Sequence, residues 1–152
     1  VNGNEFTKQI NEYAKKNNSE VLLVSAKIES EISQILDENE KKEFLESLGL
    51  IETGLKRVIR KGYEILNYIN FFTAGEKELR AWTIVKGSLA PTAAGTIHSD
   101  MEKGFIRAET ISYNDYIEFN GEAGSKEKGK LRLEGKEYVV QDGDVMHFLF
   151  NV

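Results

Sequence analysis

A glycine- and lysine-rich stretch, Gly124–Leu131, comes nearest in this chain to a phosphate-binding loop. Its letters GSKEKGKL approach the pattern G-x-x-x-x-G-K-[ST], in which backbone N–H groups hold phosphates and the last hydroxyl holds magnesium. The last position is Leu131, which has no hydroxyl, and the stretch leads toward strand-like residues instead of a helix whose N-terminus could bind phosphate. We therefore interpret the match as a chance resemblance.

The other residues with catalytic chemistry do not form a recognisable set. The two histidines, His98 and His147, have no neighbours at metal-ligand spacing, and the chain has no cysteine. No nucleophile is paired with a base, and no carboxylate sits in an apolar stretch that would raise its pKa. We therefore predict neither catalytic residues nor a metal site, and we first interpret the chain as a binding module.

Cations gather in and after the glycine-rich stretch, where they alternate with glutamates. The cations are Lys126, Lys128, Lys130 and Arg132. A solvated loop is the simpler interpretation. The alternative is an RNA-contacting edge that also includes Arg80 and the neighbouring Trp82, because cations and aromatic rings together bind nucleic acid. With a net charge of −5, the chain would have to use such a local patch to contact RNA.

Helical periodicity dominates residues 1–69, and Asn4, Asp37 and Gly49 mark expected helix ends. The apolar run Val21–Val24 predicts a strand buried on both faces, as in a parallel α/β sheet. Ligands bind at the carboxyl ends of such strands, which is where Ser25, Ala26 and Lys27 stand. On the local sequence alone, a plain strand-to-helix connection is the favoured alternative for these three residues.

From residue 70 the pattern changes to alternation. Strands are expected at 79–85, 105–111 and 145–152, with a helix that begins near Pro91 and ends at Gly104. We also expect a short strand at 117–119, a mobile loop at 120–130, and a hairpin that pairs 131–134 with 138–140. The order strand, strand, helix, strand, strands is that of a β-grasp, so the predicted fold class is α+β.

Composition limits the compartment and the partners. The chain has 152 residues, 40% of them hydrophobic and 30% charged, and no apolar run long enough to cross a membrane. The absence of cysteine suits a reducing cytoplasm. The first residue is Val1 and not Met, so we expect a trimmed piece of a longer protein.

Several motifs resemble one family. The chain is similar to the C-terminal TGS domain of the Obg-like ATPases, the YchF family, at Phe71–Gly75, Arg80–Thr83, Ala93–His98, Glu102–Glu109 and Asp142–Phe148. Ser25–Glu29 and Phe44–Leu50 resemble the end of the same family's G domain. The resemblance implies a β-grasp (ubiquitin-like) TGS domain at 70–152, preceded at 1–69 by a mostly helical remnant of an α/β Rossmann-like G domain.

The resemblance also implies a function for the longer protein. It would be a cytosolic NTPase that prefers ATP to GTP, needs magnesium and associates with ribosomes or ribosomal RNA. Ser25, Ala26 and Lys27 match the motif that lines the purine base, largely through backbone groups. We expect a monomer, with neither a membrane nor DNA as partner.

The chain also lacks segments that the family needs for its chemistry. The family's P-loop, switch segments and base-selecting motif would all lie upstream of Val1, and phosphoryl transfer depends on them. We therefore expect this chain alone to bind ATP and magnesium poorly and not to hydrolyse ATP. The alternative is a stand-alone RNA- or protein-binding β-grasp module in which residues 1–69 are a helical adaptor.

Overall fold

The computed structural model describes residues 4–75 and 78–151 and divides the chain into two compact units. The first unit is Val1–Gly62 and the second is Tyr63–Val152. The sequence placed the domain boundary between residues 69 and 70, a few residues later, and that domain assignment stays a prediction. No helix in the described ranges is long and apolar enough to cross a membrane.

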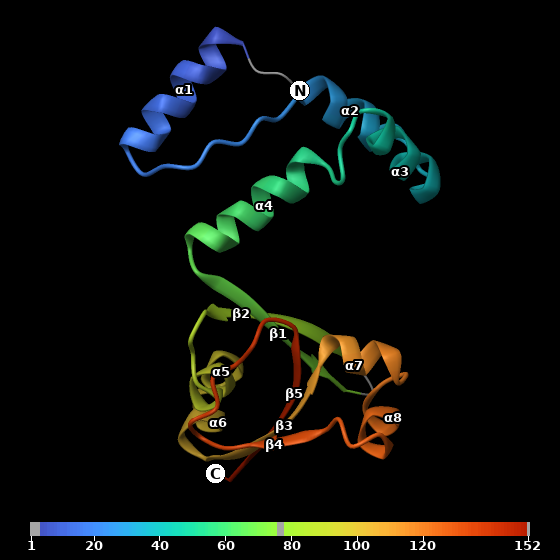
Figure 1. The fold of residues 1–152 in the computed structure, drawn as a ribbon. Coiled ribbons are helices and arrows are strands. Elements are labelled where there is room, and N and C mark those ends of the chain that lie inside the picture. The colour runs from blue at the N-terminus through green and yellow to red at the C-terminus, as the bar shows by residue number, and fades with distance from the viewer. Residues whose placement is uncertain (1–3, 76–77, 152) are drawn as a thin grey trace. The chain divides into compact units, whose positions relative to one another are not determined.

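The first unit consists of short helices with well-defined caps (Figure 1). They are α1 (Glu5–Lys16), α2 (Ala26–Gln34), α3 (Glu38–Ser47) and α4 (Gly54–Ile65), which continues into the second unit. The Asn4 side chain accepts the Thr7 N–H at 3.0 Å, and Asp37 accepts two backbone N–H groups at the start of α3. Gly49 has a φ of +69°, the left-handed conformation expected after a helix end. The three predicted helix ends are thus confirmed.

Glu29 of α2 caps α4 from a distance of 25 residues. Its Oε1 accepts the Gly54 N–H at 2.7 Å, and its Oε2 accepts the Leu55 N–H at 3.3 Å. A Cβ on Gly54 would lie 2.8 Å from that Oε1 and 2.9 Å from a methyl carbon of Val24. Glycine at position 54 therefore allows α4 to begin directly against α2.

The strand predicted at Val21–Val24 is absent, which is a correction. These residues form an extended connection, and Val21, Leu23 and Val24 are 38%, 49% and 45% exposed. A strand needs a neighbour for its backbone hydrogen bonds. The described part of the first unit contains no such neighbour, and the Leu23 carbonyl instead accepts a hydrogen bond from Arg57 at 3.3 Å.

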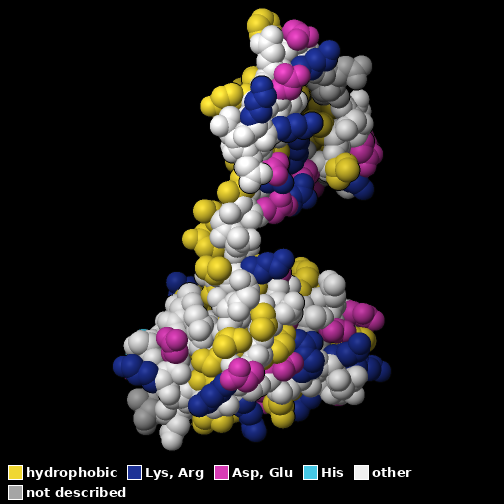
Figure 2. Space-filling view, turned by 60° about the vertical axis from the view of Figure 1, so that its left-hand side comes forward, with side chains coloured by type: hydrophobic (Ala, Val, Ile, Leu, Met, Phe, Trp, Pro, Cys, Tyr) yellow, Lys and Arg dark blue, Asp and Glu magenta, His cyan; other side chains and the backbone are white. Residues whose placement is uncertain are grey.

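Apolar side chains of the first unit remain at its surface. Phe6 and Tyr13 of α1 are 73% and 70% exposed, and Leu55 of α4 is 63% exposed. Hydrophobic side chains are visible on the surface in Figure 2. Only Ala14, Ile32 and Leu45 are buried hydrophobic residues among those described in this unit, so it has a small core.

The second unit is built on a mixed five-stranded sheet, which confirms the α+β class. The strands are β1 (Tyr68–Ala74), β2 (Leu79–Val85), β3 (Phe105–Ser112), β4 (Arg132–Glu134) and β5 (Asp144–Phe150). Their order across the sheet is β2-β1-β5-β3-β4. The β1 and β5 strands are parallel, and the other neighbouring pairs are antiparallel.

The core lies between the sheet and two consecutive helices, α5 (Ala90–Ile97) and α6 (Ser99–Lys103). Ala93 and Ala94 of α5 are fully buried, and their small side chains let the helix approach the sheet closely. Phe71 of β1 meets Phe148 of β5 edge to face, with ring centroids 5.7 Å apart. Pro91 stands in the first turn of α5, as predicted.

Two further helices replace structure that the sequence suggested. The helices α7 (Tyr113–Glu118) and α8 (Glu122–Glu127) occupy the positions of the expected strand at 117–119 and of most of the expected mobile loop. Ser125 of α8 is fully buried, and its Oγ donates to the Asp115 carbonyl at 3.2 Å. A Cβ on Gly124 would lie 1.9 Å from the Phe119 carbonyl oxygen, so the glycine permits this close packing.

The hairpin expected between 131–134 and 138–140 does not form. Instead β4 pairs with β3, with Thr110 opposite Arg132. The later segment pairs with the residues at the start of α5 and just before it. There the Ala90 N–H donates to the Tyr138 carbonyl at 2.8 Å, and the Val140 N–H donates to the Ser88 carbonyl at 3.0 Å. Both segments thus satisfy their backbone groups with more distant partners.

Candidate functional site

Ser25, Ala26 and Lys27 form the start of α2. The Ser25 hydroxyl accepts the Ile28 N–H at 3.4 Å as the N-cap, and Ala26 is the first residue of the helix. All three residues are exposed, and the one ion pair of Lys27 among the described residues is a weak contact of 3.9 Å with Glu31. Backbone N–H groups in the first turn of a helix lack intrahelical partners, so those of Ala26 and Lys27 are placed to meet a ligand.

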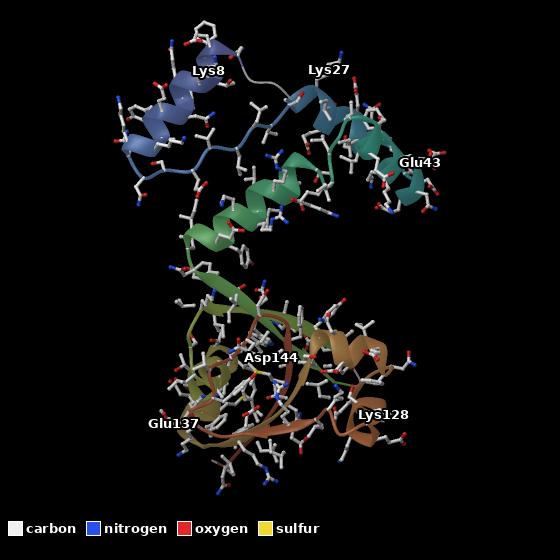
Figure 3. The ribbon with its side chains drawn as sticks, in the orientation of Figure 1. Lys8, Lys27, Glu43, Lys128, Glu137 and Asp144 are labelled. Atoms are coloured by element: carbon white, nitrogen blue, oxygen red, sulfur yellow. The ribbon has the colours of Figure 1, made fainter. Side chains whose placement is uncertain are left out.

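Two of the four clustered cations are free at the surface. Lys126 is in the last turn of α8 and Lys128 follows as its C-cap, and both side chains are exposed. Figure 3 shows Lys128 at the outer side of α8. No ion pair to either lysine occurs within the described residues. These two side chains are therefore available to an anionic partner.

Lys130 is instead held within the unit. Its ammonium lies 3.2 Å from a carboxylate oxygen of Asp115. The other Asp115 oxygen accepts the Ser112 hydroxyl at 2.6 Å. The hydrogen bond from Ser112 and, second, that from Lys130 lower the pKa of Asp115 below its ordinary value. A partner that used Lys130 would have to compete with this carboxylate.

Arg132 is engaged even more fully. Its guanidinium donates to Glu134 at 2.9 Å, to the Tyr138 hydroxyl at 3.0 Å and to Asp144 at 3.4 Å. Burial lowers the pKa of Arg132, but its bond to Glu134 and the neighbouring acidic groups outweigh that effect and raise it. The geometry thus assigns Arg132 a structural role inside the second unit.

Asp144 is the centre of that network, although the sequence pointed to it only as part of the family-like segment Asp142–Phe148. It is 2% exposed, and its Oδ2 accepts the Tyr138 hydroxyl at 2.7 Å and the Gln141 N–H at 2.9 Å. Figure 3 shows Asp144 within the second unit. Burial and the bond to Asp144 raise the pKa of Tyr138 to about 12. Nothing in the local sequence distinguished this buried aspartate from an ordinary turn residue.

Arg80 lies apart from the other cations. Its guanidinium carbon is 4.1 Å from the centroid of the Trp82 ring, and the indole N–H donates to Thr73 at 3.0 Å. Arg80 is in β2 and Arg132 in β4, and the sheet order places three strands between them. Because neighbouring strands lie about 4.8 Å apart, the two edges are separated by roughly 19 Å. They are two separate candidate contacts, and not one joined edge.

The described residues do not fit a nucleotide phosphate or its magnesium ion. In the near-match to a phosphate-binding loop, Gly124–Glu127 belong to α8, and the segment after Gly129 leads to β4. A phosphate-binding loop needs the reverse order, a strand before it and a helix after it. The described part of the chain also holds no group of three or more histidine or acidic side chains that could bind a metal.

Comparison with known proteins identifies the relatives. A family model named YchF-GTPase_C, described as "Protein of unknown function (DUF933)", matches residues 68–151. Proteins named "Ribosome-binding ATPase YchF" are similar across nearly the whole chain. That of Haemophilus influenzae is 60% identical over 149 residues, covering 98% of this chain, and that of Bacillus subtilis is 59% identical over 150 residues, covering 99%.

A solved structure agrees with these matches. The structure of the Schizosaccharomyces pombe YchF GTPase superposes with a TM-score of 0.79 at 35% identity, over 96% of this chain and 39% of that one. The chain spans 41% of the length of the two bacterial relatives. With more than half of its residues inside the family model and near-complete coverage by these relatives, the chain belongs to the YchF family.

Proposed function

We propose that this chain is the C-terminal regulatory and docking part of a cytoplasmic, ribosome-associated NTPase that prefers ATP. The observation that carries the proposal is 57–60% identity, over 98% of the chain, to proteins named "Ribosome-binding ATPase YchF". The chain corresponds to 41% of their length. The catalytic machinery would then lie in the remaining part of the longer protein.

The second unit would be a β-grasp TGS domain at residues 70–152. The mixed sheet with central parallel strands, the order β2-β1-β5-β3-β4 and the α5 helix packed on the core support this assignment. Residues 1–69 would be the remnant of a Rossmann-like G domain. The exposed apolar side chains of α1 and α4 support that assignment, because large apolar groups at a surface commonly contact further protein.

The longer protein would bind ATP with magnesium, and Ser25, Ala26 and Lys27 would contact the purine base. The free N–H groups at the start of α2 support this role, since a base can be held by backbone groups. The described residues offer no phosphate cradle, so the chain alone would show no ATP turnover. Hydrolysis by a pure sample of the chain would contradict this part of the proposal.

The contact with the ribosome would be made by Lys126 and Lys128, with Lys130, Arg132 and Arg80 as secondary candidates. The exposure of the first two lysines supports this ranking, as does the engagement of Lys130 and Arg132 by carboxylates. Co-sedimentation of the chain with ribosomes tests the proposal. A chain that remains in the supernatant would contradict it.

A further inference from the structure

The outer edge of β2 carries backbone groups that no strand uses. In the sheet order β2 is terminal, and no strand in residues 4–75 and 78–151 pairs with its outer side. The β1–β2 ladder continues in both directions, with Lys86 N–H donating to the Asn67 carbonyl at 2.6 Å and Gly75 N–H donating to the Glu78 carbonyl at 2.9 Å. In an antiparallel pair of strands, every second residue directs both its N–H and its carbonyl toward the partner strand. In β2 these are the even-numbered residues, whose backbone groups point toward β1. The N–H groups of Ala81, Thr83 and Val85 therefore point outward, as do the carbonyls of Ala81 and Thr83.

A groove of about 470 Å³ runs beside this edge. It is lined by Thr83, Ile84 and Val85 of β2, by Thr92 and Thr96 of α5, and by Ser88 and Tyr68. Successive side chains of a strand point to opposite faces, so three consecutive lining residues mean that the groove follows the strand edge itself. Thr92 and Thr96 are four residues apart and form one side of α5 facing the groove.

The charges around the groove favour an acidic partner. None of its lining residues is charged, whereas the exposed cations Arg80 and Lys86 stand at the two ends of the free stretch. Neither cation has an ion pair among the residues that the structure describes. Glu78 precedes β2 and lies outside the stretch from Ala81 to Val85 whose backbone groups point outward.

We propose that an extended segment of a partner protein adds to this sheet as a sixth strand along β2. The alternating outward N–H and carbonyl groups are satisfied by another extended backbone and not by RNA, which presents no such ladder. The segment would carry uncharged, β-branched residues along the groove and Asp or Glu at both ends, opposite Arg80 and Lys86. The proposal stands apart from the contact proposed for Lys126 and Lys128 of α8, and of the secondary candidates for that contact it shares only Arg80 of β2.

The test uses the whole 152-residue chain and the end-blocked peptide DEVTVIDE as the probe. Amide NMR shifts should change on peptide addition at residues 81–86 and along Ser88–Thr96. A peptide of the same core with Lys in place of its acidic residues should bind more weakly, and added salt should reduce the difference. No shift at the β2 edge up to about 1 mM acidic peptide would overturn the proposal.

Two variants sharpen the test. Ala81→Pro removes one outward N–H and leaves the β1 ladder intact, because proline is tolerated on an edge strand when its N–H side faces solvent. We expect it to weaken peptide binding about tenfold, whereas Ala81→Ser, which keeps the N–H, should bind as the wild type does. Equal binding by Ala81→Pro and Ala81→Ser would contradict strand addition.

Lys86→Glu provides a second comparison that does not disturb the strand. It should weaken binding of the acidic peptide, while Lys103→Glu, an equal charge change on α6, should not. If the shifts at β2 appear on raising the protein concentration without peptide, the edge pairs with a second copy and the proposal fails. It also fails if a uridine oligonucleotide, and not the peptide, produces them.

Discussion

Arg132 on β4 and Asp144 at the start of β5 are joined by a guanidinium–carboxylate contact of 3.4 Å, although β3 lies between their strands. Tyr138, from the connection between the two strands, completes the group by donating to Asp144 at 2.7 Å. This contact draws a predicted ribosome-contacting cation into the fold of the second unit. It also gives that fold a buried charge whose removal can be measured.

Neutralising Asp144 should destabilise the second unit. Asp144→Asn replaces a buried acceptor of three hydrogen bonds with an amide that can satisfy only some of them. We expect the free energy of unfolding to fall by about 1–3 kcal/mol in urea denaturation. The matched control is Glu137→Gln at an exposed neighbouring residue, which has no ion pair or side-chain hydrogen bond within residues 4–75 and 78–151, and it should change stability by less than about 0.5 kcal/mol. Equal effects of the two substitutions would contradict a structural role for Asp144.

Tyr138 predicts an alkaline loss of stability. Its pKa is raised from 10.0 to about 12 in the folded chain, so between these pH values the folded chain keeps a proton that the unfolded chain has lost. The ionisation of Tyr138 should therefore not change the free energy of unfolding below pH 10, and it should lower that free energy as the pH rises from 10 to about 12. Tyr138→Phe should lack this part of the pH dependence. The difference in phenolate absorbance between wild type and variant reports the pKa, and a midpoint near 10 would refute the expectation.

Gly124 tests the packing of α8. The added methyl of Gly124→Ala would lie 1.9 Å from the Phe119 carbonyl oxygen, so the backbone has to move. We expect a loss of about 2 kcal/mol or more in the free energy of unfolding. Gly135→Ala is the control, because a Cβ there meets nothing within 4 Å and the residue has no left-handed conformation. If both variants are as stable as wild type, α8 does not pack on α7 as described.

These elements show what the sequence could and could not predict. The strand β2, the helix start at Pro91 and the caps at Asn4 and Asp37 followed from local patterns, which short-range contacts determine. The single helix expected from Pro91 to Gly104 is instead broken at His98 into α5 and α6. The helix α8 did not follow from local patterns, because its glycine and lysine content is typical of loops. Its stability depends on the burial of Ser125 and on the approach to Phe119, and neither contact is visible in a local pattern.

The failures in the first half and at the candidate site have a related cause. An apolar run such as Val21–Val24 forms a strand only when a partner strand is present, and the sequence pattern does not say whether one is. The clustered cations are visible along the chain, but their partners are distant in sequence. Asp144 holds Arg132 from twelve residues away and Asp115 holds Lys130 from fifteen, so the sequence could not separate engaged from free cations.

ATP turnover should be absent from the isolated chain. A phosphate-release assay with ATP and magnesium should give the same rate with and without the chain, because no described segment forms a phosphate cradle. Turnover that follows the chain through successive purification steps would show that the chain holds a catalytic site of its own.

The measurement that tests the central claim most directly is co-sedimentation of the 152-residue chain with ribosomes at several salt concentrations. The chain should pellet with ribosomes, and Lys126→Ala combined with Lys128→Ala should weaken the binding and reduce the dependence of log K on log salt by about 1 for each lysine in contact. Lys15→Ala combined with Lys16→Ala, an equal loss of charge at the end of α1, should leave the pelleting unchanged. A chain that stays in the supernatant at low salt, or lysine variants of α8 that pellet as well as wild type, would contradict the proposed docking role of this surface.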